Sequence, residues 1–247
     1  METVEGRRAV YELLQSRRQA VKILIAKNIK PSDIVKKIEA LANEQGIRID
    51  RVDKERLDEL SQSRAHQGVI AIVEHYHYLS FAELSKGLDK SKNPVLLILD
   101  EITDPQNFGA LIRSADAAGV SGIIVAKRRS APMSAVVHKA SAGATAYVKI
   151  AQVSNLAYTI DDLKEMGFWI AGASERAERL YFEADLNLPV AIVLGSEGKG
   201  ISRLVSEKCD FMVAIPMEGH VSSLNVSVAG ALLMYEALRQ RIIAKKE

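Results

Sequence analysis

The sequence predicts an α/β protein whose larger part is built on a parallel β-sheet. From about Pro94 onward, apolar stretches of strand length alternate with stretches of helical periodicity, which is the pattern of a parallel sheet with helices on its faces. About 75 residues before this region show a shorter strand–helix alternation of their own. A polar segment ending in Pro94 separates the two. We therefore expect a small α/β domain at 1–76, a linker at 77–93 and a larger α/β domain at 94–247.

The composition is that of an ordinary globular protein with 48% hydrophobic and 26% charged residues. The single cysteine, Cys209, excludes a disulfide within the chain and any cysteine-rich zinc site. Its position at the end of a predicted helix favours a structural role. The N-terminus is charged and amphipathic rather than a signal peptide, and the longest apolar runs are too short to span a bilayer. We expect a cytoplasmic protein.

The elements of the first domain follow from periodicity and from helix start and stop residues. We predict a helix over 3–19, a strand over 21–27, a helix from Pro31 to Gln45 that ends at Gly46, a strand over 47–53, a short helix over 54–62 and a strand over 68–76.

The second domain continues in the same manner. Asp104 and Pro105 are well suited to the N-cap and first position of a helix. The predicted strands are 94–100, 121–127, 146–150, 168–173, 188–195 and 211–215, and the predicted helices are 105–119, 133–142, 155–166, 202–208 and a final helix from Ser222 to Arg241.

Polar residues gather where several of these strands end. Ser222, Ser223 and Asn225 crowd the start of the final helix, although one Ser or Asn is enough to cap it. Ligands of open α/β proteins bind at this edge of the sheet. The glycine-rich GSEGKG at 195–200 follows another strand. It fits neither a Walker A loop nor a dinucleotide fingerprint, which leaves a turn where backbone approaches a ligand closely.

Three segments, in this order, closely resemble the signature motifs of the SpoU/TrmH-type RNA ribose 2′-O-methyltransferases of the SPOUT superfamily. They are LDEITDPQNFGALIRSADAAGV (99–120), LPVAIVLGSEGKGIS (188–202) and IPMEGHVSSLNVSVAGAL (215–232). The resemblance covers the chain from about Pro94 to its end. It implies a parallel-sheet domain with a deep trefoil knot, which holds S-adenosyl-L-methionine in a bent shape.

The resemblance also implies roles for individual residues. The matching reaction-site residues are Asn107, Arg113, Glu197, Ser223 and Asn225, and the matching cofactor-binding residues are Leu194, Gly195, Ile215, Met217 and Leu224. Gly195 would leave room for the ligand. No metal is implied. Read without the motifs, the apolar residues could equally fill a core, and Arg113 could pair with Asp116 on the helix surface.

Arg113 is a poor proton acceptor, because a guanidinium stays protonated at neutral pH. Our hypothesis is that it stabilises the alkoxide of the attacking 2′-hydroxyl and holds the adjacent phosphate. Removal of the proton then falls to water or to Glu197.

The start of the chain, EGRRAVYELL, and the stretch SRAHQGVIA resemble the RNA substrate-binding domain of many of these enzymes, which itself is similar to the L30e/L7Ae proteins. Either an RNA contact or a plain loop accounts for His66-Gln67-Gly68. The net charge is only +2, but basic residues cluster at Arg7-Arg8, Arg17-Arg18 and 127–129. Local patches of this kind can bind phosphates.

The resemblance therefore implies an RNA 2′-O-methyltransferase that forms a homodimer through its C-terminal domain and final helix. The two-domain layout is most similar to that of the RlmB-type enzymes, which methylate a guanosine of large-subunit ribosomal RNA. Two alternatives stay open: a tRNA ribose 2′-O-methyltransferase, and a non-catalytic RNA-binding ribosome assembly factor.

Overall fold

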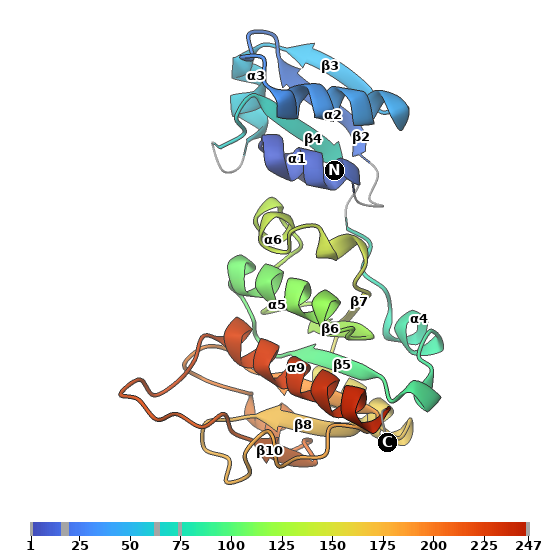
Figure 1. Ribbon diagram of the computed structural model, residues 1–247, viewed down its shortest axis with the longest axis vertical. Coiled ribbons are helices and arrows are strands. Elements are labelled where there is room, and N and C mark those ends of the chain that lie inside the picture. Colours follow the sequence, from blue (N-terminus) through green and yellow to red (C-terminus); the bar gives the residue numbers. More distant parts are fainter. Residues whose placement is uncertain (1, 16–19, 62–64, 74–75, 246–247) are drawn as a thin grey trace. The chain divides into compact units, whose positions relative to one another are not determined.

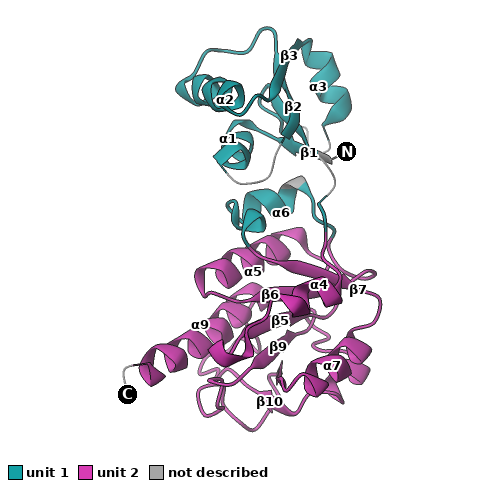
Figure 2. Cartoon of the chain, turned by 90° about the vertical axis from the view of Figure 1, so that its right-hand side faces the viewer, with its two compact units in different colours: residues 1–77, 132–147 teal, residues 78–131, 148–247 magenta. Residues whose placement is uncertain are grey.

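A computed structural model of the chain describes residues 2–15, 20–61, 65–73 and 76–245. These residues form two compact units, which Figure 2 shows in different colours. The first unit takes residues 1–77 and 132–147, and the second takes residues 78–131 and 148–247. The predicted boundaries, which place 132–147 in the larger domain, remain a prediction.

The first unit contains a four-stranded sheet in the order β1-β4-β2-β3. β2 runs parallel to β3, whereas β4 is antiparallel to both β1 and β2. The ends of β1, β2 and β3 and the start of β4 therefore lie at one edge of the sheet, and a helix follows each of the first three strands there. The elements are β1 (Glu2–Glu5), α1 (Arg7–Gln15), β2 (Ala20–Ala26), α2 (Asp33–Glu44), β3 (Arg48–Val52), α3 (Lys54–Leu60) and β4 (Val69–Val73).

The strand β1 shows that the predicted helix over 3–19 is wrong at its start. Residues 2–5 extend along β4, with Val4 opposite Ala71, and the helix begins only at Arg7. Gly6 separates the two elements with a φ of +95°, which glycine adopts without steric cost. Local periodicity missed this strand because its pairing partner lies far along the chain. Residues 16–19, the rest of the predicted helix, lie outside the described part.

The second unit contains a sheet of six parallel strands in the order β10-β8-β9-β5-β6-β7 (Figure 1). This confirms the predicted parallel sheet. The two central strands, β5 and β9, are buried at every residue, as expected for parallel strands with helices on both faces. The strands are β5 (Val95–Leu99), β6 (Gly122–Ala126), β7 (Ile150–Val153), β8 (Trp169–Ala173), β9 (Val190–Leu194) and β10 (Phe211–Val213).

Helices α5 and α9 lie side by side on this unit (Figure 1). Gly230 permits their close contact: a Cβ there would stand 2.5 Å from Leu111 Cδ2 of α5 and 2.6 Å from Leu194 Cδ1 of β9. Among the described residues, no helix is long and apolar enough to cross a membrane. The helices of residues 78–245 are α4 (Phe81–Lys86), α5 (Pro105–Ala117), α6 (Ala135–Ala140, in the first unit), α7 (Leu156–Glu165), α8 (Arg203–Ser206) and α9 (Val226–Ala244).

Two further sequence predictions are wrong in detail. Residues 144–146 form a short 3-10 turn, and β7 starts only at Ile150, opposite Ile123. Helix α9 begins at Val226 rather than at Ser222, because Asn225 is its N-cap. The Asn225 side chain Oδ1 accepts from Ser227 N at 2.9 Å. Residues 222–224 therefore stay in the preceding loop.

The C-terminal half of α9 is fastened to two distant loops by Arg241. Its Nε donates to Asn93 O at 2.9 Å and its Nη2 donates to Leu188 O at 2.9 Å. A third bond runs from Nη1 to Ala237 O at 2.8 Å within the helix. Burial lowers the pKa of this guanidinium below its ordinary value. Arg241 thus ties the helix to the chain segments that enter β5 and β9.

We expect Arg241→Met to lower the free energy of unfolding by about 2–4 kcal/mol, because the carbonyl oxygens of Asn93 and Leu188 lose their donor in a partly buried place. Urea unfolding with an unchanged m-value measures this loss. The control is Arg203→Met on α8, whose side chain is 83% exposed and, within the described part of the chain, pairs with Glu207 alone. This control should change stability by less than about 0.5 kcal/mol. Equal losses in the two variants would contradict the prediction.

Candidate functional site

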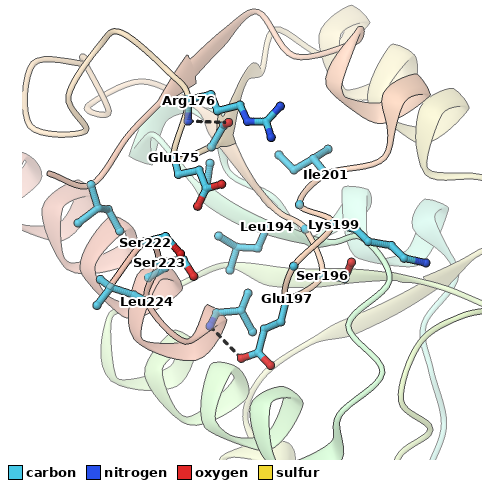
Figure 3. A pocket seen from close by; sticks show the side chains of 18 of the residues that line it. Glu175, Arg176, Leu194, Ser196, Glu197, Lys199, Ile201, Ser222, Ser223 and Leu224 are labelled. Carbon is cyan, nitrogen blue, oxygen red and sulfur yellow. Dashed lines mark hydrogen bonds between the residues drawn. The ribbon is translucent and has the colours of Figure 1, made fainter. Parts of the chain in front are cut away.

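A cavity of about 620 Å³ opens in the second unit at the carboxyl ends of three neighbouring strands, β8, β9 and β10. Figure 3 shows side chains from the loops after these strands and from the loop before α9 around it. This is the edge where ligands of parallel sheets bind, and where the sequence predicted the site. Nearly all lining residues fall within 173–176, 194–201, 212–217 and 222–229.

Residues 195–201 form a tight loop after β9 that folds back on itself. Ser196 N donates to Gly200 O at 3.1 Å, and Gly200 N donates to Ser196 O at 2.9 Å. A Cβ on Gly195 would stand 2.0 Å from the carbonyl carbon of Gly200 and 2.1 Å from Ile201 N. Gly195 does line the cavity, but the space left by its missing side chain is taken by the loop's own backbone. The expectation that the missing Gly195 side chain leaves room for the ligand is therefore wrong, because the backbone of Gly200 and Ile201 occupies that space.

Asp100 holds both ends of this loop. It follows β5, is only 6% exposed, and its Oδ2 accepts from Ser202 N at 2.7 Å. Its own N–H donates to Leu194 O at 2.8 Å, where the loop begins. The buried carboxylate thus fixes the loop against the neighbouring strand.

The side chains of Asn107, Glu197 and Asn225 meet beside the cavity, which Glu197 and Asn225 line and Asn107 does not. Glu197 Oε1 accepts from Asn107 Nδ2 at 3.2 Å and from Asn225 Nδ2 at 2.7 Å. Asn107 Oδ1 accepts from Asn225 Nδ2 at 2.9 Å. A longer contact of 3.4 Å joins Glu197 Oε1 to Val226 N at the start of α9. We call Asn107, Glu197 and Asn225 the polar triad; each comes from a different one of the three sequence motifs.

The hydrogen bonds of the polar triad determine how its groups are oriented. Asn225 Oδ1 accepts from both the N–H and the hydroxyl of Ser227, at 2.9 and 2.6 Å. The Asn225 amide nitrogen must therefore face Asn107 and Glu197. On Glu197, Oε1 is engaged, while Oε2 has no hydrogen-bond partner among the described residues. One oxygen of this carboxylate thus remains available for a ligand.

Apolar side chains form part of the cavity wall at the predicted positions. Leu194 is buried, and Ile215, Met217 and Leu224 are half-buried. The volume lies within the range of about 300–1,000 Å³ usual for small-molecule sites. An apolar wall beside backbone N–H and C=O groups suits a flat nucleobase, so these residues fit the predicted S-adenosylmethionine.

Two of the predicted reaction-site residues do not join the polar triad. Ser223 lines the cavity but is exposed, and it makes no hydrogen bond with a described residue. Arg113 is exposed, does not line the cavity and forms no ion pair with any described residue, so the alternative pairing with Asp116 is absent. It lies six residues after Asn107 on α5, which is about 9 Å further along the helix and on another side.

Sequence reasoning missed three charged residues that line the cavity, Glu175, Arg176 and Lys199. Figure 3 shows Glu175 on the side of the cavity opposite Glu197. Ser174 Oγ accepts from Arg176 N at 3.2 Å, which orders the start of this loop. Glu175 and Arg176 lie in the loop after β8, whereas Lys199 lies in the loop after β9 with Glu197. The strand-end argument, applied to FWIAGASER, could have found Glu175 and Arg176.

The other candidate residues have local explanations. Burial raises the pKa of the Cys209 thiol to about 11, so it stays protonated at neutral pH and is a poor nucleophile. In the third basic cluster, Arg129 pairs with Glu101 at 2.8 Å. Arg17 and Arg18 lie outside the described residues. Among the residues that are described, no three His, Cys, Asp or Glu side chains are grouped to hold a metal ion.

Comparisons with known proteins agree with this geometry. Residues 94–235 match the SpoU rRNA Methylase family, and residues 3–79 match a domain described as RNA 2′-O ribose methyltransferase substrate binding. YacO of Bacillus subtilis (strain 168), named as a TrmH family tRNA/rRNA methyltransferase, is 45% identical over 239 residues. That alignment covers 96% of this chain and 95% of YacO.

Solved structures show the same fold. The SpoU methyltransferase AviRb from Streptomyces viridochromogenes, in complex with AdoMet, matches with a TM-score of 0.80 at 24% identity, over 98% of this chain and 90% of its own. An RNA 2′-O ribose methyltransferase structure matches with a TM-score of 0.74 at 29% identity, over 97% of this chain and 88% of its own. The chain belongs to the SpoU/TrmH family of RNA methyltransferases, enzymes that use S-adenosylmethionine as the methyl donor.

Proposed function

We propose that this chain methylates the ribose 2′-hydroxyl of a guanosine in large-subunit ribosomal RNA. The observation that carries the proposal is the polar triad, two of whose residues line the cavity. It joins all three family motifs in one hydrogen-bonded group beside a cavity of nucleoside size. The RNA methyltransferase activity follows from membership of the family, whereas rRNA as the substrate and guanosine as the methylated nucleoside are our proposal.

The proposed cofactor site is the apolar part of the cavity. Leu194, Ile215, Met217 and Leu224 would enclose the adenine, with the backbone of Gly195 and its loop supplying hydrogen bonds. When bound, S-adenosylmethionine supplies an electrophilic methyl group on a sulfonium. We also propose that the chain here forms the deep trefoil knot of the family. The support is that the loops 195–201 and 215–225 line one cavity.

The polar triad has a definite role in this proposal. Asn107 and Asn225 hold Glu197 through Oε1, which leaves Oε2 to accept the proton of the 2′-hydroxyl directly or through water. A carboxylate is a much weaker base than the alkoxide of a ribose, so transfer of the proton would accompany attack rather than precede it. Ser223, which is exposed at the cavity, would orient the ribose.

Arg113 would contribute to the reaction by contacting the bound RNA. Its guanidinium is exposed and unpaired among the described residues, so it is available to hold the phosphate next to the reacting ribose. It would stabilise the developing alkoxide by its charge and hold two oxygens of the phosphate through two parallel hydrogen bonds. Because Arg113 lies outside the cavity, this contact requires bound RNA.

We propose that the chain forms a homodimer through exposed apolar residues on one face of α9. Val228, Leu232, Tyr235, Ile242 and Ile243 are 48%, 37%, 49%, 47% and 43% exposed. Their spacing places them along one side of the helix. An apolar stripe of this length is unusual on a monomer and marks an interaction site. We propose that α9 of a second copy covers it.

The first unit is proposed to bind the RNA, with a fold similar to the L30e/L7Ae proteins. The support is its match to the substrate-binding domain and its mixed sheet with helices.

We expect the enzyme to act in the cytoplasm, on RNA made there. A tRNA substrate is the second candidate, because the name of YacO covers both tRNA and rRNA. A non-catalytic assembly factor would have no need of the intact polar triad.

The substrate proposal is tested by transfer of labelled methyl groups to unmodified ribosomal RNA and tRNA, offered separately. We expect label in large-subunit rRNA, recovered as 2′-O-methylguanosine after digestion. Label found only in tRNA would replace the substrate and keep the chemistry. No label in either pool, with cofactor bound, would favour the assembly factor.

We expect Glu197→Gln to lower kcat by about 100-fold or more, because the amide cannot accept the proton. The amide has nearly the shape of the carboxylate, so calorimetry should show S-adenosylmethionine still bound. Glu207→Gln on α8, which lies outside the cavity, is the control and should keep full activity. A kcat within about threefold of the unsubstituted enzyme would rule out Glu197 as proton acceptor.

Arg113→Lys separates charge from geometry. A lysine keeps the positive charge but cannot form the two parallel hydrogen bonds of a guanidinium. We expect transfer to fall by about 10-fold or more while the affinity for S-adenosylmethionine is unchanged. Activity that largely persists in Arg113→Lys and is lost in Arg113→Ala would show that charge alone suffices.

The homodimer is tested by light scattering on Leu232→Arg/Tyr235→Arg. Two buried arginines at a helix pair would repel each other and remain unpaired, so we expect the mass to fall from that of two chains to that of one. Leu204→Arg, at a residue 62% exposed on α8, should leave the mass unchanged. An unsubstituted protein with the mass of one chain would refute the dimer.

A further inference from the structure

A second cavity, of about 270 Å³, lies at the helix-bearing edge of the four-stranded sheet in the first unit. The end of β2, the residues that follow β3, the residues that precede β4 and the first residue of α1 all contribute to it. We call this cavity the basic cavity, because four of its lining residues are basic and two are acidic. The residues are Arg7, Lys27, Lys30 and Lys54, with Asp53 and Glu55.

The floor of the basic cavity is a rigid turn at His66, Gln67 and Gly68. Ala26 N donates to Gly68 O at 2.9 Å, and Gly68 N donates to His66 Nδ1 at 3.0 Å. The proton of this neutral imidazole is therefore on Nε2, which stands 2.9 Å from Asp58 Oδ1. Gln67 has a φ of +53°, a left-handed conformation that is rare for a residue with a side chain. Such strain persists only where the surroundings enforce it, and it is common at ligand sites.

Arg7 is held in place by neutral partners alone. Its Nε donates to Gln67 O at 3.0 Å, and its Nη1 donates to Ser32 Oγ at 3.2 Å. It forms no ion pair with any described residue. A half-buried guanidinium is usually placed against an anion. Here the guanidinium is oriented but its charge is uncompensated, which is the arrangement expected of an anion site.

Two helix N-cap residues at this edge bond other partners and do not cap their own helices with their side chains. The side chains of Ser32 before α2 and of Asp53 before α3 accept no bond from their own helix. Ser32 instead accepts from Arg7, and Asp53 pairs with Lys27 at 3.0 Å. By contrast, side-chain oxygens cap α4, α5, α6, α7 and α9. The start of the 12-residue α2, which no side chain caps, adds to the positive potential of the edge.

Lys30 and Lys54 complete the rim. Both are exposed, and neither forms an ion pair within the described part of the chain. Because Asp53 neutralises Lys27, the remaining charged residues of the lining are three basic ones, Arg7, Lys30 and Lys54, and one acidic one, Glu55. The basic cavity therefore carries a local excess of positive charge, although the whole protein has a net charge of only +2.

We propose that the basic cavity binds a backbone phosphate of the substrate RNA, with Arg7 as the oriented donor and Lys30 and Lys54 as flanking charges. This inference rests on the proposed function and gives the RNA a defined contact in the first unit. No Phe, Tyr or Trp is among the lining residues, so the cavity offers no platform for stacking a base. The amides of Asn28 and Gln67 are placed to bond sugar hydroxyls or phosphate oxygens. The contact therefore positions the RNA and does not read its sequence.

The test uses the full chain and a fluorescent mixed-sequence single-stranded RNA of about 20 nucleotides, a length that exceeds the site size of a small binding domain. The variant is Lys30→Ala/Lys54→Ala, because neither lysine holds the fold. We expect its Kd at 0.1 M salt to be about 10-fold weaker. The dependence of log K on log salt should also become shallower by about 1.4, since each flanking lysine neutralises one phosphate next to the one that Arg7 binds, and both of these contacts are lost.

The matched control is Lys36→Ala/Lys37→Ala, which removes the same charge from exposed positions of α2 outside the basic cavity. Its Kd should stay within about twofold of the unsubstituted chain. Asp53→Asn releases Lys27 from its ion pair and should tighten binding by about threefold. If the two double variants weaken RNA binding equally, the effect is bulk charge and the proposal is overturned.

Methyl-transfer assays on the same variants distinguish a failure of this inference from a failure of the proposed function. In methyl transfer, Lys30→Ala/Lys54→Ala should raise KM for RNA and leave kcat unchanged, because binding and not chemistry is affected. An unchanged KM would overturn the inference while the proposed function stands. Failure of the unsubstituted chain to methylate any RNA would overturn the proposed function, whatever the binding comparison shows.

Discussion

The proposed reaction site depends on the hydrogen bonds that converge on Glu197 Oε1. Asn107 on α5, Asn225 before α9 and the first backbone N–H of α9 all donate to this one oxygen. The charge of the carboxylate strengthens each bond, and its place at the start of a 19-residue helix is favoured by the helix dipole. Loss of this acceptor would leave the Asn107 amide nitrogen without its partner and would remove the side-chain hydrogen bonds that join the loop after β9 to α5 and to the start of α9.

The second constraint is the backbone contact at Gly195. The loop after β9 returns so close to its own start that no side chain fits between, and Asp100 holds its two ends against β5. A loop fixed in this manner loses little further entropy when a ligand binds. Preorganisation of this kind is an effective use of binding energy in catalysis. It would suit the proposed role of this glycine-rich loop in holding the methyl donor accurately.

The two units differ in how they use charge. Around the cavity of the second unit, Glu175 and Glu197 balance Arg176 and Lys199, which suits a ligand that carries charges of both signs. The basic cavity of the first unit has an excess of positive charge, as suits a polyanion. A nearly neutral protein can therefore bind RNA, because phosphates respond to the local potential and not to the total charge.

The sequence by itself determined most elements of the fold and the edge of the sheet where the site lies. Apolar periodicity and caps such as Asp104 and Asn155 act within a few residues, so they can be read locally. Tertiary structure alone decided that β1 is a strand, because its partner is remote. It also decided which polar side chains meet: Asn107 is separated by 90 residues from Glu197 and by 118 from Asn225. The motifs predicted these residues together with Arg113, but only packing of the helices could bring the first three into contact and leave Arg113 facing solvent.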